Sequence, residues 1–154
     1  MKLSLKYKND QSGKSLLTNN CYQTLEINNL IRRSANGEAI IQYGTGLKYK
    51  STIYGTGYTP YIKMHEILCL ECETRIYQSV RKDETIHVEH KIVPNSLFFQ
   101  PTEGEIIPFS LINHIHQLED GEISYRPLLE VVATNLTFET KNLNSVWQLQ
   151  LEEV

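Results

Sequence analysis

Short segments of alternating apolar and polar residues run along the chain and are separated by Gly, Asn, Asp and Pro. The clearest alternation lies at the two ends, over residues 2–8 and 146–152. In each segment every second residue is apolar, which is the period of a β-strand with one face on a core and the other in water. The apolar sets are Leu3, Leu5 and Tyr7 at the start, and Trp147, Leu149 and Leu151 at the end.

The first half of the chain predicts a hairpin followed by two further strands. Residues 24–32 and 38–43 are expected to pair around Ala35-Asn36-Gly37, because Asn-Gly readily adopts positive φ. Residues 47–54 alternate cleanly, with Tyr49 and Ile53 on one face. Residues 61–80 are the longest apolar-rich span, and we interpret them as one long or bent strand.

The second half continues in the same way. Residues 86–92 alternate, with Ile86, Val88, His90 and Ile92 on one face. Residues 128–138 are expected to pair with the final strand across a turn at Lys141-Asn142-Leu143-Asn144.

These segments amount to about eight to ten strands, with little helix. We therefore expect an all-β fold, either an antiparallel β-sandwich or a small barrel, with long loops. At most one short helix is expected, over residues 12–19 or 113–118. A length of 154 residues corresponds to one domain, so residues 1–154 are expected to form a single β-domain.

Composition and charge exclude several classes of function. The 15 Lys and Arg residues are fewer than the 18 Asp and Glu residues, so no basic excess favours binding to a phosphate backbone. No apolar run approaches the roughly 20 residues that span a bilayer, and no secretory signal opens the chain. Three cysteines, an odd number, are typical of a reducing compartment. We expect neither a nucleic-acid partner nor a membrane partner.

Two small clusters carry metal-ligating residue types. Cys69 and Cys72 form a C-x-x-C, but positions i and i+3 of a strand point to opposite faces, so buried, inert thiols are the expected outcome. His114 and His116 would share a strand face at about 6.5 to 7 Å, which suits two ligands of one ion. Whether either pair binds an ion is left open, because the sequence identifies no third ligand.

The chain contains no recognisable catalytic motif. Gly44-Thr45-Gly46 and Gly55-Thr56-Gly57 lack the Lys-Ser/Thr that follows the glycines of a phosphate-binding loop, and Gly-x-Ser-x-Gly is absent. We therefore expect a protein that is not an enzyme, with no cofactor and no small-molecule substrate.

Tyrosines gather in one part of the sequence. With Lys48 and Lys50, they are a candidate interface, because tyrosine is enriched where proteins contact each other. The alternative is that half of the tyrosines pack in the core and that the lysines block edge pairing of a strand. The candidate tyrosines are Tyr43, Tyr49, Tyr54, Tyr58 and Tyr61.

Two parts of the sequence resemble a family of small virion structural proteins encoded among the tail genes of double-stranded DNA bacteriophages. The first is Arg33-Ser-Ala-Asn-Gly37 with Lys48-Tyr-Lys-Ser-Thr-Ile-Tyr-Gly-Thr-Gly57. The second is Tyr125-Arg-Pro-Leu-Leu129 with Val146-Trp-Gln-Leu-Gln-Leu-Glu-Glu-Val154. The regions that these segments bound, residues 33–57 and 125–154, make up about a third of the chain, and their order is similar to that in the family.

The resemblance implies a non-enzymatic component of the tail, at the distal tail or baseplate, that is assembled in the host cytoplasm. Its partners would be other phage tail proteins and copies of itself, since rings repeat identical contacts between stiff blocks. The alternatives are a head–tail joining protein of the neck, a capsid decoration protein, or a carbohydrate-binding β-sandwich that contacts the host surface. A zinc enzyme using His114, His116 and a cysteine is the weakest alternative.

Overall fold

The structure is a computed structural model that describes residues 3–17, 20–27, 31–33, 35–36, 39–41, 48–83, 86–109 and 119–154. These residues form strands, turns and loops, with no helix among them. They divide into two compact units. Unit 1 is built from Glu71–Leu129, and unit 2 from Lys2–Leu70 and Glu130–Val154. Unit 1 is therefore an insertion in the chain of unit 2.

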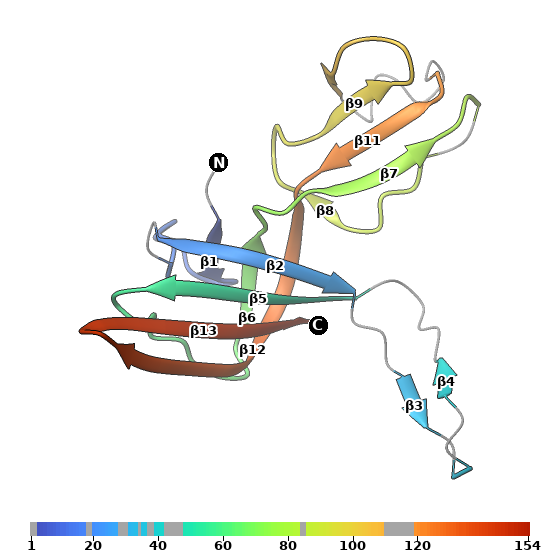
Figure 1. Cartoon of the computed structure of the whole chain (residues 1–154). Coiled ribbons are helices and arrows are strands. Elements are labelled where there is room, and N and C mark those ends of the chain that lie inside the picture. The colour runs from blue at the N-terminus through green and yellow to red at the C-terminus, as the bar shows by residue number, and fades with distance from the viewer. Residues whose placement is uncertain are drawn as a thin grey trace. The chain divides into compact units, whose positions relative to one another are not determined.

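The strands of unit 2 form one sheet in the order β1-β6-β12-β13-β5-β2 (Figure 1). Two of them, β6 and β12, include residues on both sides of the boundary between the units. The strands are β1 (Ser4–Tyr7), β2 (Cys21–Ile27), β5 (Tyr49–Thr56), β6 (Ile67–Glu71), β12 (Pro127–Lys141) and β13 (Asn144–Glu153).

One face of this sheet carries the core of unit 2. Opposed residues of an antiparallel pair share a face, and Ile53 is opposite Leu149. Both side chains are fully buried, and each contributes about 1.5–3 kcal/mol by leaving water. The predicted alternation is confirmed at the carboxyl end. At the amino end Leu3 and Leu5 are buried as predicted, but Ser4 between them is buried as well. Other buried members of this core are Leu3, Leu5, Leu68, Leu70, Val131, Trp147 and Leu151.

The predicted pairing of the last two strands is also confirmed. Lys141 is opposite Asn144, so the turn consists of Asn142 and Leu143. Both turn residues have positive φ, 49° and 67°, the combination of a type I′ hairpin turn that matches the twist of the strands. Further along, the register shifts between Ala133 and Asn135, which is a β-bulge in β12.

The first predicted hairpin is correct only near its turn. β3 (Ile31–Arg33) pairs with β4 (Ala39–Ile41), and Ala35 and Asn36 lie in a turn between them. Residues 24–27, however, belong to β2, which pairs with β5 along its whole length. The prediction extended one arm too far because an apolar pattern does not reveal which partner a strand chooses.

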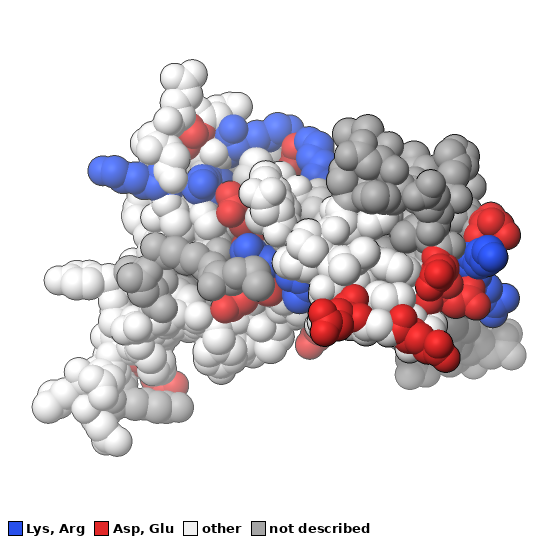
Figure 2. Space-filling model, turned by 90° about the horizontal axis from the view of Figure 1, so that it is seen from above, with Lys and Arg blue, Asp and Glu red and all other residues white. Residues whose placement is uncertain are grey.

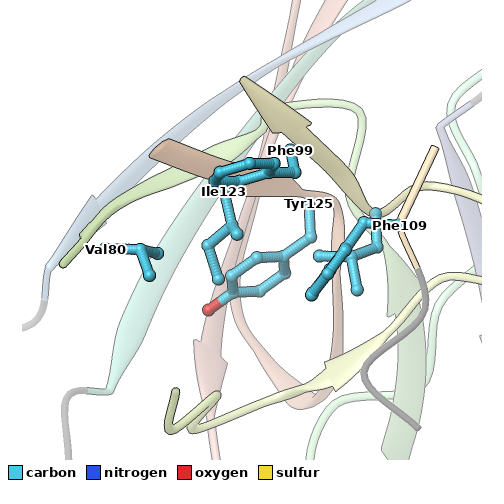
Figure 3. Close-up of a cluster of buried hydrophobic side chains, with 6 residues drawn as sticks. Val80, Phe99, Phe109, Ile123 and Tyr125 are labelled. Atoms are coloured by element: carbon cyan, nitrogen blue, oxygen red, sulfur yellow. The ribbon is translucent and has the colours of Figure 1, made fainter. Parts of the chain in front are cut away.

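Unit 1 contains a smaller antiparallel sheet in the order β10-β9-β11-β7. Its strands are β7 (Ile76–Val80), β9 (Phe98–Pro101), β10 (Ile107–Pro108) and β11 (Gly121–Tyr125). A further short strand, β8 (Lys91–Ile92), pairs with Pro127 and Leu128 of β12. The core of this unit is a cluster of aliphatic and aromatic side chains (Figure 3) that comprises Val80, Leu97, Phe99, Phe109, Ile123 and Tyr125.

The prediction of a single strand over residues 61–80 is wrong. The span contains two strands, β6 and β7, which belong to different sheets. The chain leaves β6 after Glu71 and resumes extended pairing only at Ile76, where β7 pairs with β11. In residues 86–92 burial alternates as predicted, but only Lys91–Ile92 joins a sheet.

Arg126 is buried where the chain leaves β11 for β12. Its Nε donates a hydrogen bond of 2.7 Å to the carbonyl oxygen of Cys72, and its backbone N–H donates to Oγ of Ser96 at 3.1 Å. The carbonyl of Arg126 accepts from the N–H of Val93 at 2.9 Å. The side chain and backbone of this one residue therefore connect three segments of unit 1 that are distant in sequence.

The all-β, sandwich-like class predicted from the sequence is confirmed. Of the two architectures left open, the barrel is not observed, because neither larger sheet closes on itself within the described ranges. Residues 12–17 do not form the short helix considered there, and residues 113–118 lie outside the described residues. The assignment of residues 1–154 to one domain stays a prediction.

Candidate binding surface on the open face of unit 2

The tyrosines singled out in the sequence do not form one cluster. Tyr49 is buried in the core face of β5, and Tyr54 is half-buried on the other face. Tyr58 and Tyr61 are 90% and 82% exposed in the loop that follows β5. Tyr43 lies outside the described residues. Tyr49 is therefore a core residue, whereas Tyr54, Tyr58 and Tyr61 remain candidates for a surface role.

The two lysines of the predicted interface differ in exposure. Lys48 is exposed just before β5. Lys50 is half-buried and lies opposite Glu152 of β13, with 3.7 Å between its Nζ and Oε1 of the glutamate. An exposed ion pair of this kind contributes little to stability, so its main effect is to keep this part of the sheet charged and hydrated.

A row of four side chains crosses the face of the sheet opposite the core, which we call the open face. Tyr22 is opposite Tyr54, Tyr54 is opposite Gln148, and Gln148 is opposite Thr137. Opposed residues lie on the same face of adjacent strands. The row therefore runs continuously over β2, β5, β13 and β12, which lie side by side in Figure 1.

The two tyrosines of this row stack on each other. Their ring centroids are 4.8 Å apart and their planes differ by 13°. The centroid distance matches the spacing of neighbouring strands, so the two rings stack face to face across β2 and β5. Tyr22 is 60% exposed. The sequence analysis missed Tyr22, because only the register of β2 on β5 brings it to Tyr54.

A hollow of about 540 Å³ lies over this row. Next to the row, Thr56 is opposite Val146, and Val146 is opposite Glu139, so these residues form a second row on the open face. The described lining residues of the hollow are Asn20, Tyr22, Tyr54, Gly55, Thr56, Thr137, Phe138, Glu139, Val146, Trp147 and Gln148.

The floor of the hollow is supported from the core side of the sheet. Gly55 is opposite Trp147, whose indole ring fills the space that a side chain on Gly55 would occupy. Trp147 is almost fully buried, and its Nε1 has no hydrogen-bond partner among the residues that the structure describes. The backbone under the open face is thus backed by a rigid aromatic ring.

A second exposed surface lies at the adjacent end of unit 2, which we call the tip. It comprises Tyr58 and the turn residues Asn142 and Leu143, and it lines a shallow depression with Asn144 and Ser145. The N–H of Gly57 donates to the carbonyl of Ser145 at 2.8 Å, which ties the end of β5 to the turn. Leu143 is 99% exposed, so nothing in the isolated chain gains from its apolar side chain.

Charge is distributed unevenly over the open face. Glu139 is the only charged residue among the described residues that line the hollow. Lys50 and Glu152 lie further along the same strands, away from the hollow. On the face of the molecule shown in Figure 2, Lys and Arg side chains lie beside Asp and Glu side chains. The described lining of the hollow, by contrast, carries a single charged residue.

The structure gives little support for an ion site at the candidate cysteine residues. Cys69 is half-buried and Cys72 is fully buried, and neither forms a disulfide bond. The part of the chain with described coordinates contains no group of three His, Cys, Asp or Glu residues arranged to hold an ion. His114 and His116 lie outside it.

Among the described residues, no helix is long and apolar enough to span a membrane. Comparisons with protein-family models, with curated protein sequences and with solved structures find no match to this chain.

Proposed function

We propose that this chain is a structural protein of a bacteriophage tail, positioned at the distal tail or baseplate, that acts through protein–protein contacts. In this proposal it is made in the host cytoplasm and becomes part of the virion, where it contacts other tail proteins and further copies of itself. The resemblance of its Asn-Gly, Lys-Tyr-x-Ser-Thr-Ile, Tyr-Arg-Pro-x-Leu and Trp-x-Leu-x-Leu-Glu-Glu segments to that family motivates the proposal.

The residues that characterise two of the motifs have a structural role in the fold. Tyr125, Arg126 and Trp147, which characterise two of the motifs, are all buried. They specify how the sheets are built and are inaccessible to a partner. The resemblance therefore supports a fold shared with that family. Contacts with partner proteins must be made by other, exposed residues.

The observation that carries the proposal is the conformation and exposure of Leu143. A positive φ disfavours a leucine by roughly 1–2 kcal/mol, since its Cβ approaches the following carbonyl oxygen. The side chain recovers none of this cost in the isolated chain, because it is 99% exposed. A strained and exposed residue is typical of a functional site. With Tyr58, Leu143 gives the tip two exposed side chains with apolar surface that are suited to contact with a partner protein.

The proposal is tested by mass spectrometry of purified particles of the phage that encodes the chain. We expect the chain in intact virions and, after heads and tails are separated, in the tail fraction. Its absence from particles contradicts the proposal. Its presence only with heads contradicts the tail position and favours the neck or decoration alternative, which electron microscopy of labelled particles then distinguishes.

A further inference from the structure

The hollow on the open face combines a flat aromatic surface with uncharged polar groups. Tyr22 and Tyr54 supply the aromatic surface, and Gln148 and Thr137 continue the same row. Asn20 and Thr56 add a further amide and a further hydroxyl. A pyranose ring presents the same two characters, because one of its faces is made of C–H groups and its edge carries hydroxyls. We propose that this hollow binds a neutral hexopyranose within an oligosaccharide or polysaccharide.

The geometry of the tyrosine pair prepares it for such a ligand. The two rings stand parallel with their centroids 4.8 Å apart. Each ring therefore restricts the rotation of the other, and less conformational entropy is lost when a ligand binds. One face of Tyr54 is covered by Tyr22, and Gln148 is opposite Tyr54 on the strand at the other side, β13. A sugar ring can pack on this aromatic pair while its hydroxyls reach the amide of Gln148.

The polar groups of the hollow match a ligand that both donates and accepts hydrogen bonds. The amides of Gln148 and Asn20 each carry two N–H donors and a carbonyl acceptor, and the hydroxyls of Thr56 and Thr137 do both. The carboxylate of Glu139 adds a strong acceptor. Sugar hydroxyls have the same dual character, so each of these groups can pair when water leaves.

The charge of the hollow favours the binding of neutral sugars over anionic ones. No Lys, Arg or His occurs among its described lining residues, and Glu139 contributes a negative charge. A phosphate, sulfate or sialic acid group would meet this negative charge, and none of the described lining residues offers a compensating cation. The volume of about 540 Å³ falls within the range of roughly 300–1,000 Å³ typical of small-molecule sites, and it accommodates one or two sugar rings.

This inference does not depend on a role in a phage tail. A protein loop with aromatic side chains is the competing occupant of the same surface, and the experiment below treats that as an outcome. The exposed lining is more apolar than polar, which suits either occupant, but the amide and hydroxyl groups beside the tyrosine pair favour the sugar.

Saturation-transfer NMR on the full chain tests the proposal with D-glucose, D-galactose, D-mannose, N-acetyl-D-glucosamine and L-rhamnose as separate probes. We expect transfer from the protein to the ring C–H protons of at least one sugar, with a millimolar Kd. Replacing tyrosine by threonine keeps a good strand former, so Tyr54→Thr and Tyr22→Thr should each lower the affinity at least tenfold, about 1.4 kcal/mol. Tyr61→Thr is the matched control, because Tyr61 is exposed in unit 2 but is absent from the hollow.

A second pair of measurements addresses charge and folding. Glucose 6-phosphate should bind more weakly than glucose. Glu139→Gln should reduce the difference in affinity between the two sugars, because it removes the negative charge of the hollow. Thermal unfolding of each variant shows whether it remains folded. Gln148→Leu is a further variant, which removes the amide of Gln148 and keeps a similar side-chain volume. The proposal is overturned if no sugar of the panel shows transfer, or if folded Tyr54→Thr binds as well as the wild type. It is equally overturned if a partner protein fills the hollow in assembled particles.

Discussion

The indole of Trp147 lies directly against the backbone of Gly55 on the neighbouring strand. The two residues are opposite each other in the register of β13 on β5, and a Cβ on Gly55 would overlap the six-membered part of the ring. Because Trp147 is buried, moving the ring would require its packed neighbours to rearrange. The glycine is required for this close approach, and the tryptophan in turn supports the floor of the hollow on the opposite face.

Gly55→Ala should therefore destabilise the protein, although alanine is normally preferred to glycine within a strand. Overfilling a packed core costs about 1–3 kcal/mol, and we expect a loss in that range in the free energy of unfolding, measured by urea denaturation. Thr56→Ala, at the next and exposed position, is the control and should change stability by less than about 0.5 kcal/mol. An equally stable Gly55→Ala would show that the ring does not occupy this place.

Trp147→Phe should show that the two residues act together. The smaller ring removes the indole Nε1, which is buried with no hydrogen-bond partner in the described part of the chain, and it leaves room beside Gly55. We expect Gly55→Ala to cost at least about 1 kcal/mol less in the Trp147→Phe background than in the wild type. Urea denaturation of the four proteins in this cycle measures the difference, and strictly additive effects would contradict the contact.

Period-two alternation was sufficient to predict much of the sheet of unit 2. Leu149 and Ile53 occupy alternating positions and are buried as expected, because a strand with one covered face must place every second side chain in the core. The same rule could have separated the tyrosines. Tyr49 and Tyr54 are an odd number of positions apart on one strand, so they point to opposite faces, and only Tyr54 is available to the open face.

Long-range pairing could not be predicted in the same way. Residues 61–80 have one continuous apolar composition, yet β6 and β7 belong to different sheets, because the choice of partner depends on contacts that are distant in sequence. Tyr22 joins Tyr54 only through the register of β2 on β5. The hollow depends on this register and on that of β13 and β12, so no local motif indicates it.

Arg126→Met should destabilise the protein by about 2–3 kcal/mol, because it removes the buried donor that bonds the carbonyl of Cys72. Methionine keeps a similar length and apolar stem, so the loss reflects the guanidinium and its hydrogen bonds. Chemical denaturation measures the change. Arg81→Met is the control, since Arg81 is exposed in unit 1, and equal effects of the two variants would contradict a structural role for Arg126.

Acidification should weaken the turn that Asp10 and Ser12 form, because it protonates the carboxylate of Asp10. Hydrogen bonds from the backbone N–H and the hydroxyl of Ser12 lower the pKa of Asp10 below its ordinary value of 3.8. A lowered folded-state pKa means that this contribution is present above the ordinary pKa and is lost as the pH falls through the lowered value. An NMR titration of the Asp10 carboxyl should give a midpoint below 3.8, and Ser12→Ala should return it toward that value. A midpoint unchanged by Ser12→Ala would contradict the assignment.

Leu143→Gly should affect stability and assembly in opposite directions. Glycine adopts the positive φ of this turn position without steric cost, so the free energy of unfolding of the isolated chain should rise by about 1 kcal/mol. The same change removes the exposed apolar side chain of the tip, and incorporation into particles, measured by complementing a phage that lacks the gene, should fall at least several-fold. Leu143→Asn separates the two effects, because asparagine also tolerates positive φ but is polar. It should be as stable as the wild type or more so, and it should assemble as poorly as Leu143→Gly. Normal incorporation of both variants would show that a partner does not bind Leu143, and it would remove the main structural argument for assembly through the tip.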